Sequence, residues 1–276
     1  MRFWHYSCLL LALAVLVLTS TDSYGQYGRR NIPGRTRAPV NGVVPPLPSA
    51  EFHWVRLIYG GFGRGEKFAN PGTSWTIDWP EAEHFFMQGV QRLTTVDAAQ
   101  VSLAGDGAER IKLTEDNVYD FPFLYAVEVG HWVLTDQEAA VLRDYLLRGG
   151  FFFCDDFHGT QEWEVFMESM RKVFPDRPIV EIPESNELFH TVFELDKSIQ
   201  IPGLAALYNG VTYEKDGYKP DWRGVFDDKG RLMVVLNHNM DMGDAWENAD
   251  FPEYPEAMTA RAYRFAVNYT VYAMTH

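Results

Sequence analysis

The chain has 276 residues, of which 46% are hydrophobic and 15% aromatic against 22% charged. This composition excludes a disordered, collagen-like or low-complexity protein and predicts a chain that folds around a sizeable core. The first 50 residues hold five Lys and Arg and one acid, which leaves 19 basic against 37 acidic residues in 51–276, a formal charge of −18. So acidic a domain argues against binding to nucleic acid or to an anionic membrane, since both require a basic surface.

The first 25 residues have the organisation of a secretory signal peptide. Arg2 precedes an unbroken apolar run from Leu9 to Leu18, and Ser23-Tyr24-Gly25 offers the small residues of a cleavage site. An apolar run of about ten residues is too short to cross a bilayer of about 30 Å as a helix. We therefore expect cleavage near Gln26 and export to the periplasm or the exterior, with no transmembrane segment in the mature chain. The alternative is an uncleaved N-terminal anchor.

Residues 26–50 are predicted to form a flexible linker, and residues 51–276 a single α/β domain. The linker contains five prolines, four arginines and no acid, without helical or strand periodicity. Once the signal peptide is removed, Cys154 is the one cysteine left in the sequence. No intramolecular disulfide can then form, so the fold depends on its core.

The predicted elements alternate between strand and helix along most of the domain. Residues 52–59 are expected to be a strand that stops at a Gly-rich loop. Asp78 with Glu81, in the manner of a capping box, and Pro80 in the first turn indicate the start of a helix that Asp78 would cap. The elements expected next, in chain order, are strands at 101–103 and 123–129, a helix opened by a Thr135/Glu138 capping box, a strand at 151–154, a helix from about 161 and a strand at 179–182.

This alternation implies βαβ crossovers and a mostly parallel sheet with helices on both faces. The later sequence differs, because residues 224–226 and 232–236 flank the turn-forming string Asp227-Asp228-Lys229-Gly230. That pattern predicts an antiparallel hairpin at one side of the sheet. A final helix is expected from apolar residues at helical spacing between Met258 and Tyr272. The predicted architecture is a three-layer αβα domain.

Several short strings are spread across residues 51–276. They are Asp78-Trp79-Pro80-Glu81-Ala82-Glu83, Leu146-Leu147-Arg148-Gly149-Gly150 leading into Asp155-Asp156, Phe189-His190, Gly230-Arg231-Leu232, and Arg264-Phe265-Ala266-Val267-Asn268 with Tyr272-Ala273. In combination they resemble the bacterial family known as domain of unknown function 4159. The resemblance implies a flavodoxin-like sheet of the class I glutamine amidotransferase-like type, and it implies no established activity.

An amidotransferase of that type places its nucleophilic cysteine on a tight strand-to-helix turn of the Gly-x-Cys-x-Gly kind. Here Cys154 closes an apolar strand and is followed by Asp155 and Asp156. Neighbouring carboxylates and burial both raise the pKa of a thiol, which is the opposite of activation. We therefore interpret Cys154 as a buried structural thiol, with a catalytic nucleophile as the alternative.

The ligand site is predicted at the carboxyl ends of the parallel strands, where open sheets of this kind bind ligands. Asp155, Asp156 and His158 are the candidates for catalysis there, as general acids or bases. The alternatives are that the two aspartates cap the next helix and that the histidine is an ordinary polar loop residue. The full set of predicted ligand-binding residues is Arg64, His131, Trp132, Asp155, Asp156 and His158.

A second oxygen-rich stretch is expected at the same edge if the last hairpin strand runs toward it. Asn239, Asp241 and Asp244 offer the hard oxygen ligands that Ca²⁺ or Mg²⁺ prefers. Their spacing does not match an EF-hand, and turn formation explains the same residues. A divalent cation held by these three residues is therefore a candidate cofactor.

Two functions are compatible with these residues. The first is a non-catalytic envelope module that binds a small molecule or a protein partner. The second is a hydrolase that acts on a small or carbohydrate-like substrate, with Asp155, Asp156 or His158 as general base. A metal ion held with Asp241 and Asp244 would assist the reaction in one form of this hypothesis. Tryptophans near the loops would form a sugar-stacking platform in that case, although core packing is their commoner use. They are Trp75, Trp79, Trp132, Trp222 and Trp246.

Overall fold

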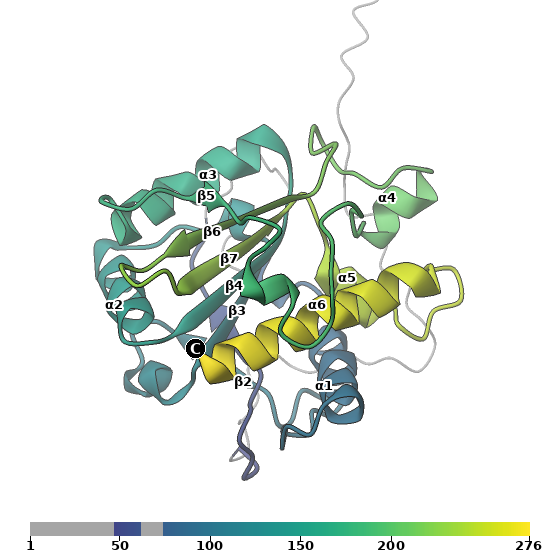
Figure 1. The fold of residues 1–276 in the computed structure, drawn as a ribbon, viewed down its shortest axis with the longest axis horizontal. Helices are drawn as coiled ribbons and strands as arrows, with labels where there is room; N and C mark the ends of the chain where they lie inside the picture. Colours follow the sequence, from purple (N-terminus) through teal and green to yellow (C-terminus); the bar gives the residue numbers. More distant parts are fainter. Residues whose placement is uncertain (1–46, 62–73) are drawn as a thin grey trace, which may run out of the picture. The chain divides into compact units, whose positions relative to one another are not determined.

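A computed structural model describes residues 47–61 and 74–276 (Figure 1). The strands are β1 (Val55–Ile58), β2 (Glu109–Lys112), β3 (Phe123–Val127), β4 (Phe151–Phe157), β5 (Val180–Glu181), β6 (Asp221–Phe226) and β7 (Leu232–His238). The α-helices are α1 (Glu81–Leu93), α2 (Asp136–Leu147), α3 (Gly159–Val173), α4 (Leu204–Tyr208), α5 (Met242–Glu247) and α6 (Glu256–Thr275). The predicted signal peptide, the linker up to residue 46 and the Gly-rich loop with Arg64 lie outside the described residues.

The strands form one sheet in the order β2-β1-β3-β4-β7-β6-β5. The first five of these pair in parallel, whereas β6 is antiparallel to both β7 and β5. The order of the five parallel strands is that of a flavodoxin-like sheet, in which successive strands are added first on one side of β1 and then, from β3 on, on its other side. The prediction of a mostly parallel sheet with an antiparallel hairpin at one side is therefore confirmed.

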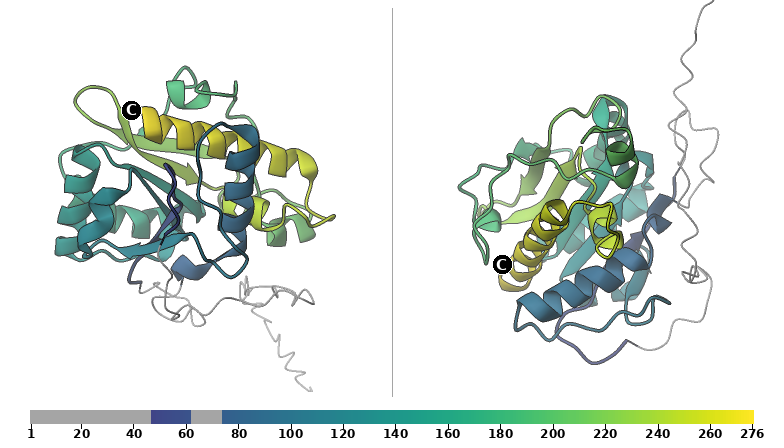
Figure 2. Two further views of the ribbon diagram at one scale, coloured as in Figure 1. Left: turned by 90° about the horizontal axis from the view of Figure 1, so that it is seen from below. Right: turned by 90° about the vertical axis from the view of Figure 1, so that its right-hand side faces the viewer.

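Helices cover both faces of the sheet (Figure 2). Along β3, Phe123 and Tyr125 pack into the hydrophobic cluster shared with α1, α5 and α6, while Leu124 and Ala126 pack into the cluster shared with α2 and α3. Successive side chains of a strand point to opposite faces, so a strand covered on both sides needs apolar residues at every position. This explains the continuous apolar runs at 123–127 in β3 and 151–154 in β4 and gives the three layers.

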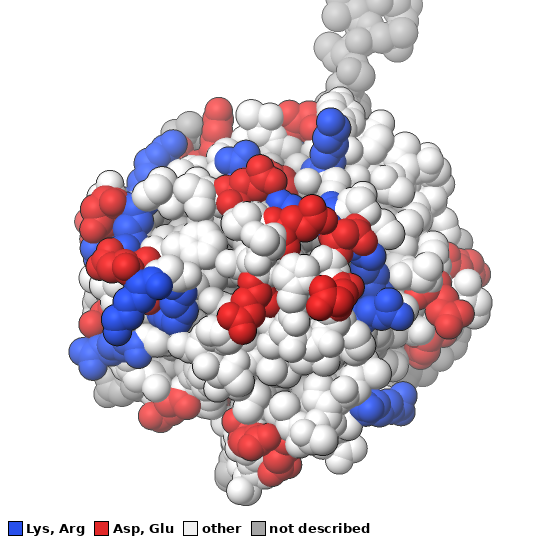
Figure 3. Space-filling model, viewed as in Figure 1, with Lys and Arg blue, Asp and Glu red and all other residues white. Residues whose placement is uncertain are grey.

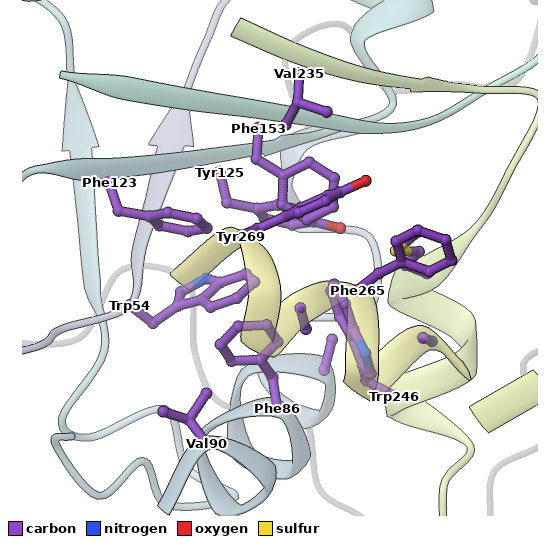
Figure 4. Packing of buried hydrophobic residues seen from close by; sticks show 14 of the residues in the cluster. Trp54, Phe86, Val90, Phe123, Tyr125, Phe153, Val235, Trp246, Phe265 and Tyr269 are labelled. Carbon is purple, nitrogen blue, oxygen red and sulfur yellow. The ribbon is translucent and has the colours of Figure 1, made fainter. Parts of the chain in front are cut away.

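Aromatic rings dominate the core between the sheet and the helices α1, α5 and α6 (Figure 4). Trp54 packs against Phe86 with ring centroids 4.3 Å apart and against Trp246 of α5 at 5.9 Å. Phe153 of β4 meets Tyr269 of α6 edge-to-face at 5.1 Å. Such pairs contribute about 0.5–1.5 kcal/mol each beyond the area they bury. Trp246 thereby holds α5 against the sheet, and α5 carries Asp244 in its first turn and Asp241 at its N-cap.

The tryptophans proposed as a sugar-stacking platform lie in the core instead. Each of the five is at most 6% exposed. An indole ring that is packed on both faces by the protein offers no face to a sugar ring. The carbohydrate platform is therefore corrected to core packing.

Two predictions about the elements are corrected. Residues 101–103 form no strand, and the edge strand is β2, in which Ile111 is the one buried residue. An edge strand with one solvated side needs no apolar run, so its sequence carries little signal. Asp78 does not cap α1, because Pro80 occupies the N-cap position. The capping box of α2, by contrast, is confirmed, with Thr135 and Glu138 each bonded to the other's backbone N–H.

Within residues 47–61 and 74–276, no helix combines the length and the apolar character that crossing a membrane would require.

Candidate functional site

The carboxyl edge of the parallel strands brings together carboxylates that are far apart in the sequence. Asp156 lies near the end of β4, Asp241 follows β7, and Asp78 precedes α1. Side-chain oxygens of these three residues lie within 4.8 Å of one another. They are named the carboxylate triad below. The expectation that β7 runs toward the edge reached by β4 is confirmed by the parallel pairing of the two strands.

The carboxylate triad is buried, with Asp78 2%, Asp156 6% and Asp241 5% exposed. Burial, together with repulsion from neighbouring carboxylates, raises the pKa of Asp156 and of Asp241 well above the ordinary value. Like charges at this separation repel strongly away from water, and the repulsion is relieved by a proton, a cation or a hydrogen-bond donor. The triad is therefore suited to bind a positively charged group.

Asp155 is completely buried beside the triad. Its Oδ2 accepts hydrogen bonds from the backbone N–H groups of Met242, at 2.9 Å, and Gly243, at 3.1 Å. Its Oδ1 has no hydrogen-bond partner among the residues that the structure describes. Burial raises the pKa of Asp155 to about 8 despite these two bonds, and Asp78 contributes to the increase. The sequence left open that Asp155 caps the helix that follows it, which is α3. Asp155 instead accepts hydrogen bonds from the first turn of α5.

The backbone at this edge is unusual. In the described parts of the chain, the non-glycine residues with a positive φ are Asp78 (60°), Glu128 (54°), Asp156 (51°), Lys215 (53°) and Asn239 (65°). All five belong to this site or border it. A left-handed conformation is unfavourable for such residues and persists where the surrounding structure imposes it, which happens most often at functional sites.

A bulge in β4 accounts for the position of Asp156. The pairing of β4 with β7 shifts between Cys154 and Phe157, and both of these residues face the α2 and α3 side although they are three positions apart. A regular strand would place them on opposite faces. The extra residue lets both Asp155 and Asp156 approach the same acidic region.

A second group, named the histidine network, adjoins the triad and consists of Glu128, His131, His158, Glu162 and Lys215. His131 Nδ1 lies 2.8 Å from Glu128 Oε2, and its Nε2 lies 3.2 Å from Glu162 Oε1. Glu162 also forms an ion pair with Lys215 and accepts the backbone N–H of His158 at 2.6 Å. Ligand atoms of Glu128, His131 and Glu162 are close enough to share a metal ion. Lys215, however, already compensates charge within this network.

His158 connects the network to the triad. Its Nε2 lies 3.0 Å from Asp156 Oδ1, and its Nδ1 has no hydrogen-bond partner in the described portion of the chain. Burial lowers the pKa of His158 to about 3 even though Glu162 opposes the shift. The imidazole is therefore neutral near pH 7, and its Nε2–H donates to Asp156 when that carboxylate is ionised. A neutral imidazole oriented by a carboxylate is common in metal sites and in general bases.

Two predicted ligand residues have other roles. Trp132 is completely buried and stacks on Phe166 with ring centroids 5.2 Å apart, so its predicted contact with a ligand is corrected to a core position. Asn239 Oδ1 accepts the backbone N–H of Gly159 at 2.8 Å, and its Nδ2 donates to Lys219 O at 2.9 Å. Its amide therefore joins α3 to a neighbouring loop and is already engaged without a metal.

Sequence reasoning missed Glu214 and treated Asp78 as a helix cap. A Cβ atom added at Gly203 would lie 2.7 Å from Glu214 Oε1, 2.7 Å from Asp241 Oδ2 and 3.2 Å from Asp244 Oδ2. Three carboxylates thus converge on a position that only glycine leaves open. The sequence signal for Asp78 is its place between the first strand and the first helix. That strand, like the other parallel strands, ends at the carboxyl edge of the sheet. Glu214 lies in a long irregular segment and has no such signal.

Cys154 is expected to react slowly in the native protein. It is completely buried in β4, and burial with a contribution from Asp155 raises its pKa well above the ordinary value. A thiol reagent such as 5,5′-dithiobis(2-nitrobenzoate) should label the native chain at least about tenfold more slowly than the urea-unfolded chain, because only the thiolate reacts. Rapid native labelling, with glutamine hydrolysis lost in Cys154→Ser, would contradict this interpretation.

The family model described as Domain of unknown function (DUF4159) matches residues 67–274. The chain belongs to this family. Among curated proteins, none matches the chain. The carboxylate triad and the histidine network all fall between residues 67 and 274, so the site lies within the part of the chain that defines its membership of DUF4159.

Proposed function

We propose that this DUF4159 domain is an exported module that binds a divalent cation of the Ca²⁺ or Mg²⁺ class and uses it to hold a small molecule or a protein partner. The observation that supports the proposal most is the carboxylate triad, three buried aspartates from separate segments with oxygens within 4.8 Å. Export rests on the apolar run of residues 9–18 and the small residues that follow it.

The chemistry of the triad favours a hard cation. All of its donors are carboxylate oxygens, which Ca²⁺ and Mg²⁺ prefer, whereas Zn²⁺ sites usually include cysteine or histidine. Ca²⁺ binds oxygen at about 2.3–2.6 Å, so two ligands of one ion lie at most about 5 Å apart. The observed limit of 4.8 Å satisfies this requirement. The unpartnered Oδ1 of Asp155 adds a further buried oxygen next to the triad.

The surface charge favours a ligand that is not a polyanion. Acidic side chains cross the middle of the face in Figure 3, and Lys and Arg are scattered among and around them without forming a broad basic area. Together with the formal charge of −18 for residues 51–276, this supports a small ligand or a protein partner over nucleic acid.

A second candidate function is hydrolysis of a small substrate assisted by the bound cation. It is favoured by His158, whose neutral imidazole is held by Asp156 and whose Nδ1 has no hydrogen-bond partner in the described part of the chain. A cation polarises the substrate in such reactions, while a general base activates water.

Thermal unfolding of the chelated, purified protein tests the cation site. At a concentration of Ca²⁺ or Mg²⁺ about 100 times the dissociation constant, binding stabilises the folded state by about 2.7 kcal/mol, which raises the Tm by roughly 5–10 °C for a domain of this size. Asp156→Asn and Asp241→Asn should each abolish the increase, and the exposed Glu253→Gln should retain it.

Measurements of Tm and of hydrolysis distinguish the binding module from the hydrolase, and they also show whether the cation site exists at all. A cation-dependent Tm without hydrolysis of chromogenic esters or amides supports the binding module. Cation-dependent hydrolysis that disappears in His158→Gln, while the Tm increase remains, would favour the hydrolase. An unchanged Tm at millimolar concentrations of both ions would contradict the cation site itself.

A further inference from the structure

We propose that the site binds two divalent cations side by side, with Asp78 as the carboxylate that bridges them. The inference rests on the proposed function and extends it to a second ion. Asp156 and Asp241 complete the ligands of the first ion. Asp244 and Glu247 complete those of the second, because their oxygens also lie within 4.8 Å of each other and of Asp78. One aspartate thus belongs to two sets of potential ligands.

The helix α5 places the second set. Asp244 and Glu247 are three residues apart on this helix and therefore lie on the same side of it. Asp244 Oδ2 accepts the backbone N–H of Leu204 at 2.6 Å, which fixes the orientation of its carboxylate. A Cβ atom at Gly243 would collide with Asp78 Oδ2. The glycine therefore allows Asp78 to approach the first turn of α5, from which it reaches both sets.

Charge compensation favours two ions over one. Five carboxylates form the two sets, and Asp155 and Glu214 lie beside them. A single divalent cation balances two negative charges, whereas two such ions balance four. A second cation would relieve the repulsion that remains after the first has bound.

The unpartnered oxygen of Asp155 is an independent observation that points to a ligand. Gly243 N–H donates to Asp155 Oδ2 at 3.1 Å, and Asp78 Oδ2 approaches the same glycine, so the two carboxylates are neighbours. Asp155 is 0% exposed, and no group in residues 47–61 or 74–276 donates to its Oδ1. A buried carboxylate oxygen without a donor is unfavourable, and a cation, or water bound to a cation, satisfies it.

The proposed arrangement has a recognisable chemistry. Two-metal sites typically hold their ions about 3.5–4 Å apart and stabilise both the attacking and the leaving oxygen of a displacement. Oxygen-only ligands suit Mg²⁺, Ca²⁺ and Mn²⁺. Mn²⁺ is therefore a suitable probe, because its electron paramagnetic resonance spectrum changes when two ions are coupled through a shared ligand.

Mn²⁺ binding to the chelated full chain tests the inference by equilibrium dialysis and electron paramagnetic resonance. The wild-type protein should bind two Mn²⁺ ions per chain with a spin-coupled spectrum. Glu247→Gln should bind one ion with an uncoupled spectrum, and Asp78→Asn should lose the coupling together with most of the binding. Glu253→Gln, on the exposed turn before α6, should behave like the wild type. The Tm of each metal-free variant checks that it is folded.

Two results would overturn the bridged pair while leaving the proposed function intact. One is a single Mn²⁺ per wild-type chain that is lost in Asp156→Asn and retained in Glu247→Gln. The other is two bound ions without spin coupling. Absence of any Mn²⁺ binding in the wild type would contradict both the pair and the proposed function.

Discussion

Replacement of Arg56 by methionine is expected to destabilise the domain by about 3–5 kcal/mol, because it leaves Glu83 buried without its charged partner. Both side chains are 0% exposed and form an ion pair across the interface between β1 and α1. The guanidinium also donates to the carbonyl oxygens of Trp75, at 2.9 Å, and Ile77, at 2.6 Å. It therefore joins β1 to the segment that positions Asp78, and the variant should also bind cations more weakly.

Urea unfolding monitored by circular dichroism measures this effect, and two variants serve as controls. Arg56→Met combined with Glu83→Leu should recover most of the lost stability, since a buried ion pair exchanged for apolar residues is often neutral. Arg143→Met removes the half-buried partner of the exposed Asp176 and should change the free energy of unfolding by less than about 1 kcal/mol. If Arg56→Met were as mild as Arg143→Met, the stabilising role assigned to the buried pair would be wrong.

The metal-free domain is expected to become less stable as the pH rises from about 4 to about 8. The pKa of Asp155 is raised to about 8 by burial, and the pKa values of Asp156 and Asp241 are also raised. In the unfolded chain an aspartate titrates near 3.9, so between the two values the folded state holds protons that the unfolded state has released. The associated stability is fully present below about pH 4 and is lost through about pH 8.

The size of this effect is large for a single group. One pKa unit corresponds to 1.36 kcal/mol, so the shift of Asp155 alone corresponds to a loss on the order of 5 kcal/mol across this range. Exposed acids in ion pairs have the opposite effect, because they lower the stability of the folded state as the pH falls below about 4. Asp176 is an example, since its hydrogen bond to Arg143 lowers its pKa to about 2. The stability of the metal-free protein should therefore be greatest near pH 4–5.

Urea unfolding at pH 5, 6.5 and 8 in the presence of a chelator tests this expectation. Asp155→Asn should flatten the profile, because the neutral amide neither releases a proton nor repels its neighbours, and Glu253→Gln should leave the profile unchanged. Saturating Ca²⁺ or Mg²⁺ should restore stability at pH 8, since a cation replaces the protons. A chelated wild-type protein that gains stability from pH 5 to pH 8 would exclude the proposed burial of ionisable carboxylates.

Local sequence was sufficient for most of the architecture. The runs at 123–127 and 151–154 are apolar at every position because their strands are covered on both faces. The Thr135/Glu138 pair needs only neighbouring backbone to cap α2. The hairpin of β6 and β7 follows from the turn residues between them. The strand β2 escaped prediction because half-exposed edge strands can be polar.

The sequence alone placed Asp155 and Asp156 at the carboxyl edge of the sheet, because parallel strands carry their carboxyl ends to the same side. It placed Asp241 and Asp244 there only on the condition that the last hairpin strand runs toward that edge. Only the tertiary structure decided which side chains meet there. The β4 bulge turned Asp156 toward Asp241, the anchoring of the segment before α1 by Arg56 brought in Asp78, and ring stacking withdrew Trp132 into the core. The direction of a side chain near a strand end depends on register, bulges and contacts from distant segments, and the burial that raises the pKa of these aspartates comes from residues far away along the chain.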